Sequence, residues 1–280
     1  MQDIKHMNRI PKMYLVVLFI IVFLTEFVCH RMTKYTINKI FEKAFPTNIW
    51  KIEIDSNKPY VAVETRDVET TLASFFVFDF EGNCLMSPCQ ADGKEWTLDS
   101  IQDGYMILKR IGEQTPVQEG IQIIQILNNE VIFHSYEFVL LDVFNGFIHA
   151  RHRSISSGES IAIDIHNGEY SSSAERIFDM ASNKVQYPVT YQQTPRFLKH
   201  KHTVGPLWLS KCGHHFLWCY HKKNKDRFDL CLATSNLNQI LDQQVILKDM
   251  EKMIPQPYFQ LGNQVFFMSF NKREIVSYLV

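Results

Sequence analysis

Three charged residues close together in the chain, Glu64, Arg66 and Asp67, are the first candidates for chemistry. On a β-strand, Glu64 and Arg66 share one face and Asp67 points to the other, because side chains alternate along a strand. A carboxylate and a guanidinium on one face could orient a ligand. The alternative is an internal ion pair that holds the fold together. With two tryptophans added, the predicted ligand-binding set is Trp50, Glu64, Arg66, Asp67 and Trp96.

The second candidate is a basic stretch at residues 196–227. It has eight Lys or Arg and one acid, Asp226, so its net charge is +7, whereas the whole chain carries −1. Basic residues interleaved with aromatic ones can bind phosphates or single-stranded nucleic acid. The alternative is a solvated hairpin, with residues 222–227 as an exposed turn. The predicted anion-binding residues are Arg196, Lys199, Lys201, Lys222, Lys223, Lys225 and Arg227.

Histidines and cysteines gather in the same stretch, and a metal site is the chemistry they suggest. On one strand, however, His215 and Cys219 would lie about 13 Å apart at ~3.3 Å per residue, too far for one tetrahedral site. Cys219 and His221 could share a metal only if another strand supplied the other ligands. We therefore predict no metal and no cofactor. The full set is His200, His202, Cys212, His214, His215, Cys219 and His221.

Motifs that would name a reaction are missing from the sequence. It contains no G-x-S-x-G, G-x-x-x-x-G-K-[ST], G-x-G-x-x-G or H-E-x-x-H. The run Asp142-x-x-Asn145-Gly146 faintly resembles a calcium loop but lacks its later ligands and closing glutamate. No catalytic residue is predicted, and the sequence favours a protein that is not an enzyme.

Alternation of apolar and polar residues predicts that the chain is all-β from about residue 40 onward. Short strands with turn residues between them are typical of all-β sandwiches and barrels and of propellers. The expected strands are residues 50–54, 60–64, 74–80, 105–110, 120–127, 131–133, 138–143, 160–165, 207–209, 216–220, 228–232, 264–269 and 274–279.

A repeated unit recurs within these strands: an apolar strand, Asp, a short turn with Gly, and a second apolar strand. It is present around Asp79, Asp142 and Asp164, with a weaker copy ending near Gln125. Gly supplies the positive φ of a tight turn, and Asp can accept backbone N–H groups of that turn. The copies at residues 125, 142 and 164 are about half a propeller blade apart. We predict a β-propeller-like domain of about five to six partly degenerate four-stranded blades; a β-sandwich or open sheet stack is the alternative.

The N-terminal segment is the least globular part of the sequence. Residues 13–25 carry no charge but span only about 20 Å at ~1.5 Å per residue. Extended to residue 29, they predict an uncleaved membrane-anchor helix of marginal length, with basic residues on both sides. Alternatively translation starts at Met32 and the protein is cytoplasmic. The predicted segments are 1–12 basic flank, 13–29 anchor, 30–40 linker and 41–280 a single propeller-like domain.

The composition is ordinary for a globular protein, with 46% hydrophobic and 21% charged residues. The six cysteines form no C-x-x-C pair, which favours free thiols in a reducing compartment. Since the net charge is only −1, nucleic acid is not expected as the main partner.

The two ends of the domain resemble one bacterial family. Residues 48–52, 61–67 and 74–79, together with residues 258–267 and 276–279, resemble domain of unknown function 4905, found mostly in Bacteroidetes. The resemblance implies a propeller-like fold and brings no catalytic residues with it. The blades also resemble quinoprotein-type propellers, but the adjacent cysteines and tryptophan-docking repeats of a quinone site are missing, so no quinone is predicted.

The predicted function is therefore a non-catalytic binding or scaffold protein, with another protein as its partner and the membrane as a second partner through residues 13–29. One alternative is an enzyme with a small-molecule site at the mouth of the propeller channel. The other is a binder of phosphate, RNA or acidic lipid through residues 196–227.

Overall fold

The computed structural model describes residues 36–112, 119–155, 159–175, 177–180 and 183–280. The basic flank 1–12, the anchor 13–29 and Met32 lie outside the described residues. In the described part of the chain, no helix is long and apolar enough to cross a membrane. The compact unit begins at Ile37, inside the stretch predicted as a linker, because Ile37 is buried and strand β1 (Asn38–Ala44) follows it directly.

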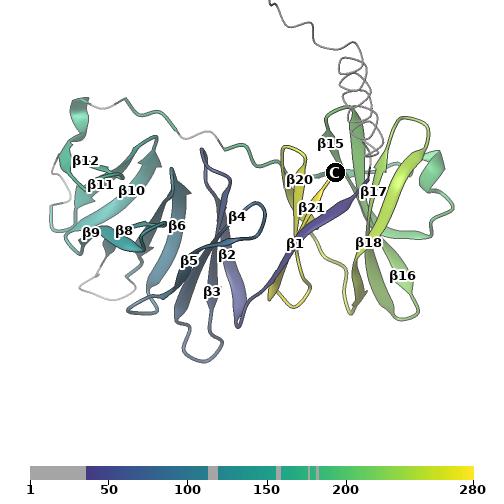
Figure 1. The fold of residues 1–280 in the computed structure, drawn as a ribbon, viewed down its shortest axis with the longest axis horizontal. Coiled ribbons are helices and arrows are strands. Elements are labelled where there is room, and N and C mark those ends of the chain that lie inside the picture. Colours follow the sequence, from purple (N-terminus) through teal and green to yellow (C-terminus); the bar gives the residue numbers. More distant parts are fainter. Residues whose placement is uncertain (1–35, 113–118, 156–158, 176, 181–182) are drawn as a thin grey trace, which may run out of the picture. The chain divides into compact units, whose positions relative to one another are not determined.

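The described chain forms five antiparallel sheets (Figure 1). Three of them follow one another along the chain, each a run of four strands paired in sequence order. They are β2 (Asn48–Ile54), β3 (Tyr60–Arg66), β4 (Ala73–Asp79) and β5 (Cys84–Gln90); β6 (Trp96–Gln102), β7 (Tyr105–Arg110), β8 (Gly120–Gln125) and β9 (Glu130–Ser135); β10 (Phe138–Phe144), β11 (Phe147–His152), β12 (Ile161–Asp164) and β13 (Tyr170–Ser172).

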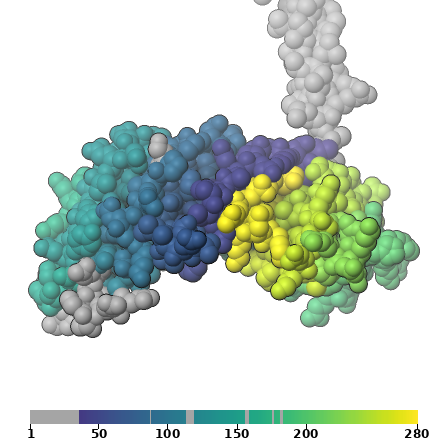
Figure 2. All heavy atoms as spheres, turned by 90° about the horizontal axis from the view of Figure 1, so that it is seen from below, coloured from purple at the N-terminus to yellow at the C-terminus, as the bar shows by residue number. Residues whose placement is uncertain are grey.

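The fourth sheet has five strands, and the fifth joins the two ends of the domain. The fourth contains β14 (Val189–Tyr191), β15 (Thr203–Cys212), β16 (His215–Asn224), β17 (Arg227–Ser235) and β18 (Ile240–Met250). The fifth contains β19 (Tyr258–Leu261), β20 (Gln264–Met268), β21 (Glu274–Leu279) and β1. Figure 2 shows β1 in purple beside the yellow C-terminal strands. Single-turn 3-10 helices are η1 (Ser173–Glu175) and η2 (Arg196–Leu198).

This strand order confirms the all-β, propeller-like prediction at the level of four-stranded antiparallel sheets. Each of the first three sheets is an up-and-down meander, and an N-terminal strand completes the last sheet, as in propellers. The alternation pattern does not predict β1, β6, β14, β18 or β19. Strands β14 and β19 have only three and four residues, and the register of β1, β6 and β18 shifts at a bulge or irregularity. A bulge inserts an extra residue and breaks the period of two.

The repeated hairpins are present, with one correction. Oδ1 of Asp79 accepts the N–H groups of Glu81 and Asn83 at 3.1 and 2.7 Å, and Gly82 has a φ of 88°. Asp164 plays the same part in the β12–β13 turn. Asp142, in contrast, lies exposed within β10, before the turn, where a register shift displaces it. Asp142 lies on β10 and Asp164 on β12, two strands further along the same four-stranded sheet. The interval between these two copies of the repeat is therefore half of one sheet, as predicted.

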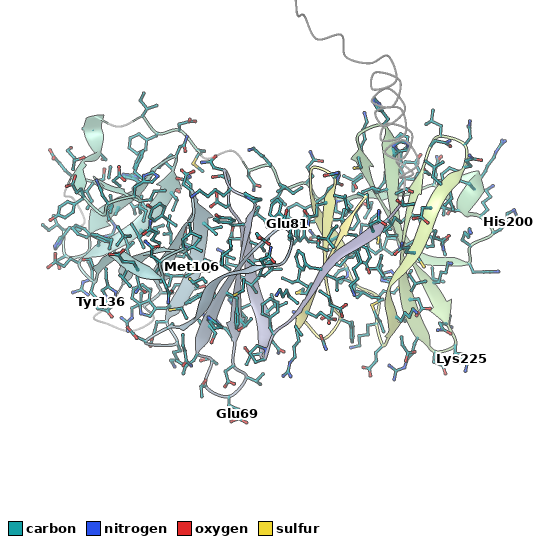
Figure 3. The ribbon with its side chains drawn as sticks, viewed as in Figure 1. Glu69, Glu81, Met106, Tyr136, His200 and Lys225 are labelled. Atoms are coloured by element: carbon teal, nitrogen blue, oxygen red, sulfur yellow. The ribbon has the colours of Figure 1, made fainter. Side chains whose placement is uncertain are left out.

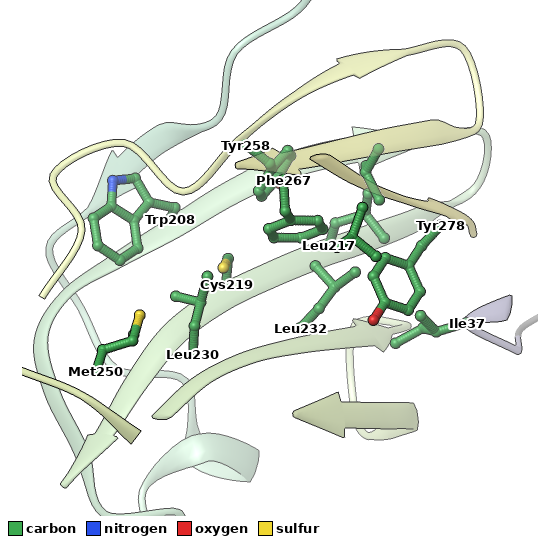
Figure 4. Close-up of a cluster of buried hydrophobic side chains, with 12 residues drawn as sticks. Ile37, Trp208, Leu217, Cys219, Leu230, Leu232, Met250, Tyr258, Phe267 and Tyr278 are labelled. Carbon is green, nitrogen blue, oxygen red and sulfur yellow. The ribbon is translucent and has the colours of Figure 1, made fainter. Parts of the chain in front are cut away.

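Neighbouring sheets are held together by apolar clusters and by a few buried polar side chains. One cluster joins β15–β18 to β19–β21 and includes Trp208, Leu232 and Phe267 (Figure 4). Between the first two sheets, Oδ2 of Asp55 accepts the N–H of Gly104 at 2.7 Å. Oε1 of Gln102 accepts the N–H of Gly146 in the next sheet at 2.7 Å. These contacts fix the relative positions of β2, β6 and β10, the first strands of three sheets.

Candidate functional site

A cavity of about 730 Å³ lies where first strands of several sheets meet. Its walls come from β2 and the β2–β3 turn, the end of β6, β10, residues 180, 183–185 and 187, and β19 and β20. Strand β2 has a strand neighbour on one side only, β3, so its other edge is free of ladder pairing. The cavity is therefore built around an inner edge strand, which is where a propeller channel is expected.

One wall of the cavity is apolar. Ile52 and Ile54 point from β2 toward the β19–β21 sheet, where they pack in one cluster with Phe259, Leu261 and Met268. All five side chains are half-buried. They leave an apolar surface that a ligand could cover.

The opposite side of β2 carries charges, because successive side chains of a strand point to opposite faces. Nζ of Lys51 donates to the carbonyl oxygens of Leu98 and Asp99 at 3.0 and 2.8 Å, and lies 3.0 Å from Oε1 of Glu53. Burial raises the pKa of Glu53, and the neighbouring Lys51 partly opposes this rise. Lys51 is thus committed to protein partners and ties β2 to β6.

Two hydroxyl groups in the lining have no hydrogen-bond partner among the described residues. Oγ of Ser56, in the β2–β3 turn, and Oγ of Ser100, on β6, are both buried from solvent. A buried polar group left unpaired costs about 1–3 kcal/mol, and such groups in native proteins call for an explanation. Because neither oxygen is accessible from the cavity, a ligand could bond them only after a change of side-chain rotamer.

Beside this cavity, the chain segment between the third and fourth sheets forms hydrogen bonds to other sheets. The carbonyl oxygen of Asp179 accepts the N–H of Asn145 at 2.8 Å. Nζ of Lys184 donates to the carbonyl oxygen of Ser56 at 3.2 Å. Gln186 and Gln260 exchange two backbone hydrogen bonds of 2.8 Å. Residues 183–187 are therefore anchored to β19 and to the β2–β3 turn, and they form one side of the cavity.

Glu64 and Arg66, the first pair predicted from sequence, lie elsewhere, between the first and second sheets. Glu64 is fully buried; its Oε1 is 2.7 Å from Nε of Arg66, and its Oε2 accepts bonds from the Thr97 hydroxyl and the Leu98 N–H. The guanidinium of Arg66 also donates to the carbonyl oxygens of Thr71, Lys94 and Trp96. Both carboxylate oxygens and all three guanidinium nitrogens thus have protein partners.

The other members of the predicted ligand-binding set are spread around this pair. Oδ1 of Asp67 accepts the N–H groups of Glu69 and Thr70, so it caps the β3–β4 turn, and these bonds lower its pKa. Figure 3 shows Glu69 at the outer tip of that turn. Trp96 is buried, with only 2% of its surface exposed. Trp50 is 68% exposed, lies 5.5 Å from the Arg66 guanidinium, and is the member of the set that lines the cavity.

The basic stretch runs over the η2 region, β15, β16 and the start of β17. Arg227 lies within 4.0 Å of carboxylate oxygens of Asp249 and Glu251. Lys222 is half-buried, with its Nζ 5.9 Å from the Tyr220 ring. The exposed members come from the η2 region and from the β16–β17 hairpin. They are Arg196, Lys199, Lys223, Lys225 and Arg227. In Figure 3, His200 and Lys225 project outward from these separate places. Anion binding by this stretch stays a prediction.

The His and Cys cluster is also dispersed. Cys219 and His221 are buried on β16, where Nε2 of His221 accepts the N–H of Ile254 at 3.1 Å. Burial lowers the pKa of His221 to about 4, so the ring is neutral at physiological pH. In the described part of the chain, no three His, Cys, Asp or Glu side chains are grouped so that they could hold a metal ion.

The residues that sequence reasoning missed are ordinary in type. Ser56, Ser100 and Lys184 belong to no motif, and they come together only because three separate segments meet at β2. One usable signal is the contrast inside residues 51–54, where charged and apolar residues alternate on an inner strand.

No protein-family model matches the chain, and no curated protein matches it either. Domain of unknown function 4905 therefore stays a prediction.

Several solved structures resemble the chain at low similarity. A member of the duf4221 family from Bacteroides vulgatus is 9% identical, with a TM-score of 0.34 over 88% of this chain and 98% of that one. The β-propeller domain of the Trilobed protease from Pyrococcus furiosus is 10% identical, with a TM-score of 0.31 over 81% and 78%. TolB from Acinetobacter baumannii is 11% identical, with a TM-score of 0.29 over 84% and 55%. Similarity at this level carries no functional argument, so the propeller-like description rests on the strand order.

Proposed function

We propose that this protein is a non-catalytic binding protein with a propeller-like fold, and that its ligand is a small molecule bound in the cavity beside β2. The observation that carries the proposal is the cavity itself. Its volume of about 730 Å³ falls within the ~300–1,000 Å³ that is typical of small-molecule sites. It combines an apolar wall with a few polar groups, among them the Lys184 ammonium, as ligand sites do.

The charged groups of the cavity favour binding over catalysis. Lys51 already bonds three oxygen atoms, and Asp55 already accepts N–H groups from Asn57, Lys58, Asp103 and Gly104. Groups held in this way position the walls. They are poorly placed to transfer a proton to or from a ligand, since a catalytic acid or base must reach the reacting atom.

A fluorescence titration with phenylnaphthylamine, a neutral apolar dye, tests the proposal. Leu261→Asp places a carboxylate in the apolar wall, and we expect it to weaken dye binding by about tenfold or more, since burying an unpaired charge is costly. The matched control is Leu237→Asp, because Leu237 is 79% exposed in the β17–β18 turn and does not line the cavity. Equal affinity of the two folded variants would refute the proposed site, as would no dye binding by the wild type.

A further inference from the structure

More lysines than carboxylates line the cavity. Lys51, Lys58, Lys184 and Lys272 line it, against two carboxylates, Glu53 and Asp55. Lys51 and Glu53 neutralise one another. The excess of positive charge must therefore come from the other three lysines.

These three lysines have no carboxylate within ion-pair distance among the residues that the structure describes. Asp55, the remaining acid, is 4% exposed, and backbone N–H groups from two turns occupy its oxygens. It is directed into the protein and not into the cavity. An approaching ligand therefore meets ammonium groups without counter-charges.

Lys184 is the best placed of the three. Its Nζ bonds the carbonyl oxygen of Ser56, so the ammonium is held beside the residue whose Oγ lacks a partner. An ammonium has three N–H donors, and this is the one hydrogen bond its Nζ makes to the described chain. The remaining donors can bind the oxygens of an acidic group.

The apolar wall is part of the same cavity. Ile54 lies two residues before Ser56, whose carbonyl oxygen holds the Lys184 ammonium, so the ammonium is at one end of the wall that Ile54 and Leu261 form. A ligand that satisfies both must have an acidic group at one end and an apolar body at the other.

We propose that the ligand is a small amphipathic anion, with its acidic group on Lys184 and its apolar body against Ile54 and Leu261. This inference rests on the proposed function, since it identifies the class of ligand for the same cavity.

Two dyes with nearly the same aromatic body separate the inference from the proposed function. Anilinonaphthalene sulfonate carries an acidic group, and phenylnaphthylamine does not. At low ionic strength we expect the sulfonate to bind about tenfold more tightly, which corresponds to about 1.4 kcal/mol. Leu261→Asp should weaken both dyes.

Charge variants then locate the acidic group. Lys184→Gln should remove most of the tenfold preference while leaving phenylnaphthylamine binding unchanged, and Lys184→Glu should reverse the preference. Lys184 is exposed, so these variants are expected to fold. Lys223→Gln, at the exposed end of β16, is the matched control and should leave the preference unchanged.

The failures are distinguishable. Equal binding of the two dyes, with both sensitive to Leu261→Asp, would overturn the anion inference and leave the cavity as the site. A sulfonate preference that Lys223→Gln removes and Lys184→Gln does not would also overturn it, since the anion would then bind the basic stretch. Binding of neither dye, or binding that is insensitive to Leu261→Asp, would overturn both proposals.

Discussion

The β2–β5 sheet has two charged regions, and their polar groups are used in different ways. At one, Glu64 and Arg66 bond each other, three groups of β6 (the Thr97 hydroxyl, the Leu98 N–H and the Trp96 carbonyl oxygen) and the carbonyl oxygen of Lys94 before it. At the other, around the β2–β3 turn, Ser56 and Ser100 keep unpaired buried hydroxyls, and Lys184 has N–H donors that no described residue accepts. A saturated network stabilises a fold, whereas unused donors that reach a cavity are available to a ligand. The predictions below test this contrast.

The largest effect is expected at the saturated network. Glu64→Gln removes the charge that compensates Arg66, and breaking a buried ion pair costs about 3–5 kcal/mol of unfolding free energy. Urea denaturation would measure the loss. Glu69→Gln, on the exposed turn nearby, is the control and should change stability by less than about 0.5 kcal/mol. If Glu64→Gln left stability intact but abolished dye binding, the network would be a ligand site and the contrast would be reversed.

His221 tests whether an unpaired buried atom alone marks a site. Its Nδ1 lacks a partner, but it lies in the β16 core, away from the cavity lining. Its pKa is lowered from 6.5 to about 4 by burial, so between these values the unfolded chain holds a proton that the folded chain does not.

Stability linked to His221 should therefore fall as the pH falls from about 6.5 to about 4 and then level off. The loss is up to about 3 kcal/mol, from 1.36 kcal/mol per pKa unit. Unfolding measured across this range, in the wild type and in His221→Phe, should show the smaller slope in the variant. Identical slopes would show that His221 does not carry this linkage. Dye affinity should be the same in both proteins at neutral pH.

Ser100→Ala is expected to change the unfolding free energy in the opposite direction from Glu64→Gln. Because Oγ of Ser100 is buried without a protein partner, removing it relieves a desolvation cost and should leave the melting temperature unchanged or raise the unfolding free energy by up to about 1 kcal/mol. Thermal unfolding without ligand is the measurement. A clear destabilisation would mean that the hydroxyl has a structural partner and that this wall resembles the Glu64 network.

Trp50 lies between the two regions and should show the smallest effect on stability. It stacks against Arg66 at 5.5 Å and also lines the cavity. Exposed cation–π contacts contribute about 0.5–1 kcal/mol, so Trp50→Ala should cost no more than that in urea denaturation. A loss above about 2 kcal/mol would place Trp50 inside the structural network.

The sequence predicts the sheets better than it predicts the cavity. Alternating strands and the Asp–Gly hairpins depend on neighbouring residues, so Asp79 and Asp164 are recognisable without a structure. Strand β6 is missed because the register shift between Leu98 and Ser100 breaks its alternation. Glu64 and Arg66 stand out because charges are rare inside an apolar strand, and the ion-pair alternative for them depends only on their spacing.

The cavity depends on contacts between distant parts of the chain. Residues from Ile49 to Lys272 line it, and the position of Lys184 is set by the pairing of Gln186 with Gln260. No local pattern encodes such pairing. The residue types are also uninformative, since Ile, Leu, Ser and Lys are common in any strand or turn.

Hydrogen exchange with saturating anilinonaphthalene sulfonate tests the contrast between the two regions most directly. We expect peptides covering residues 49–58 and 183–187 to gain protection, because the ligand covers the free edge of β2 and the segment that holds Lys184. Peptides covering residues 64–72 and 94–98, which contain the Glu64 network, should exchange as they do without ligand. Protection confined to residues 64–72 and 94–98, or to residues 196–227, with none at 49–58, would contradict the account.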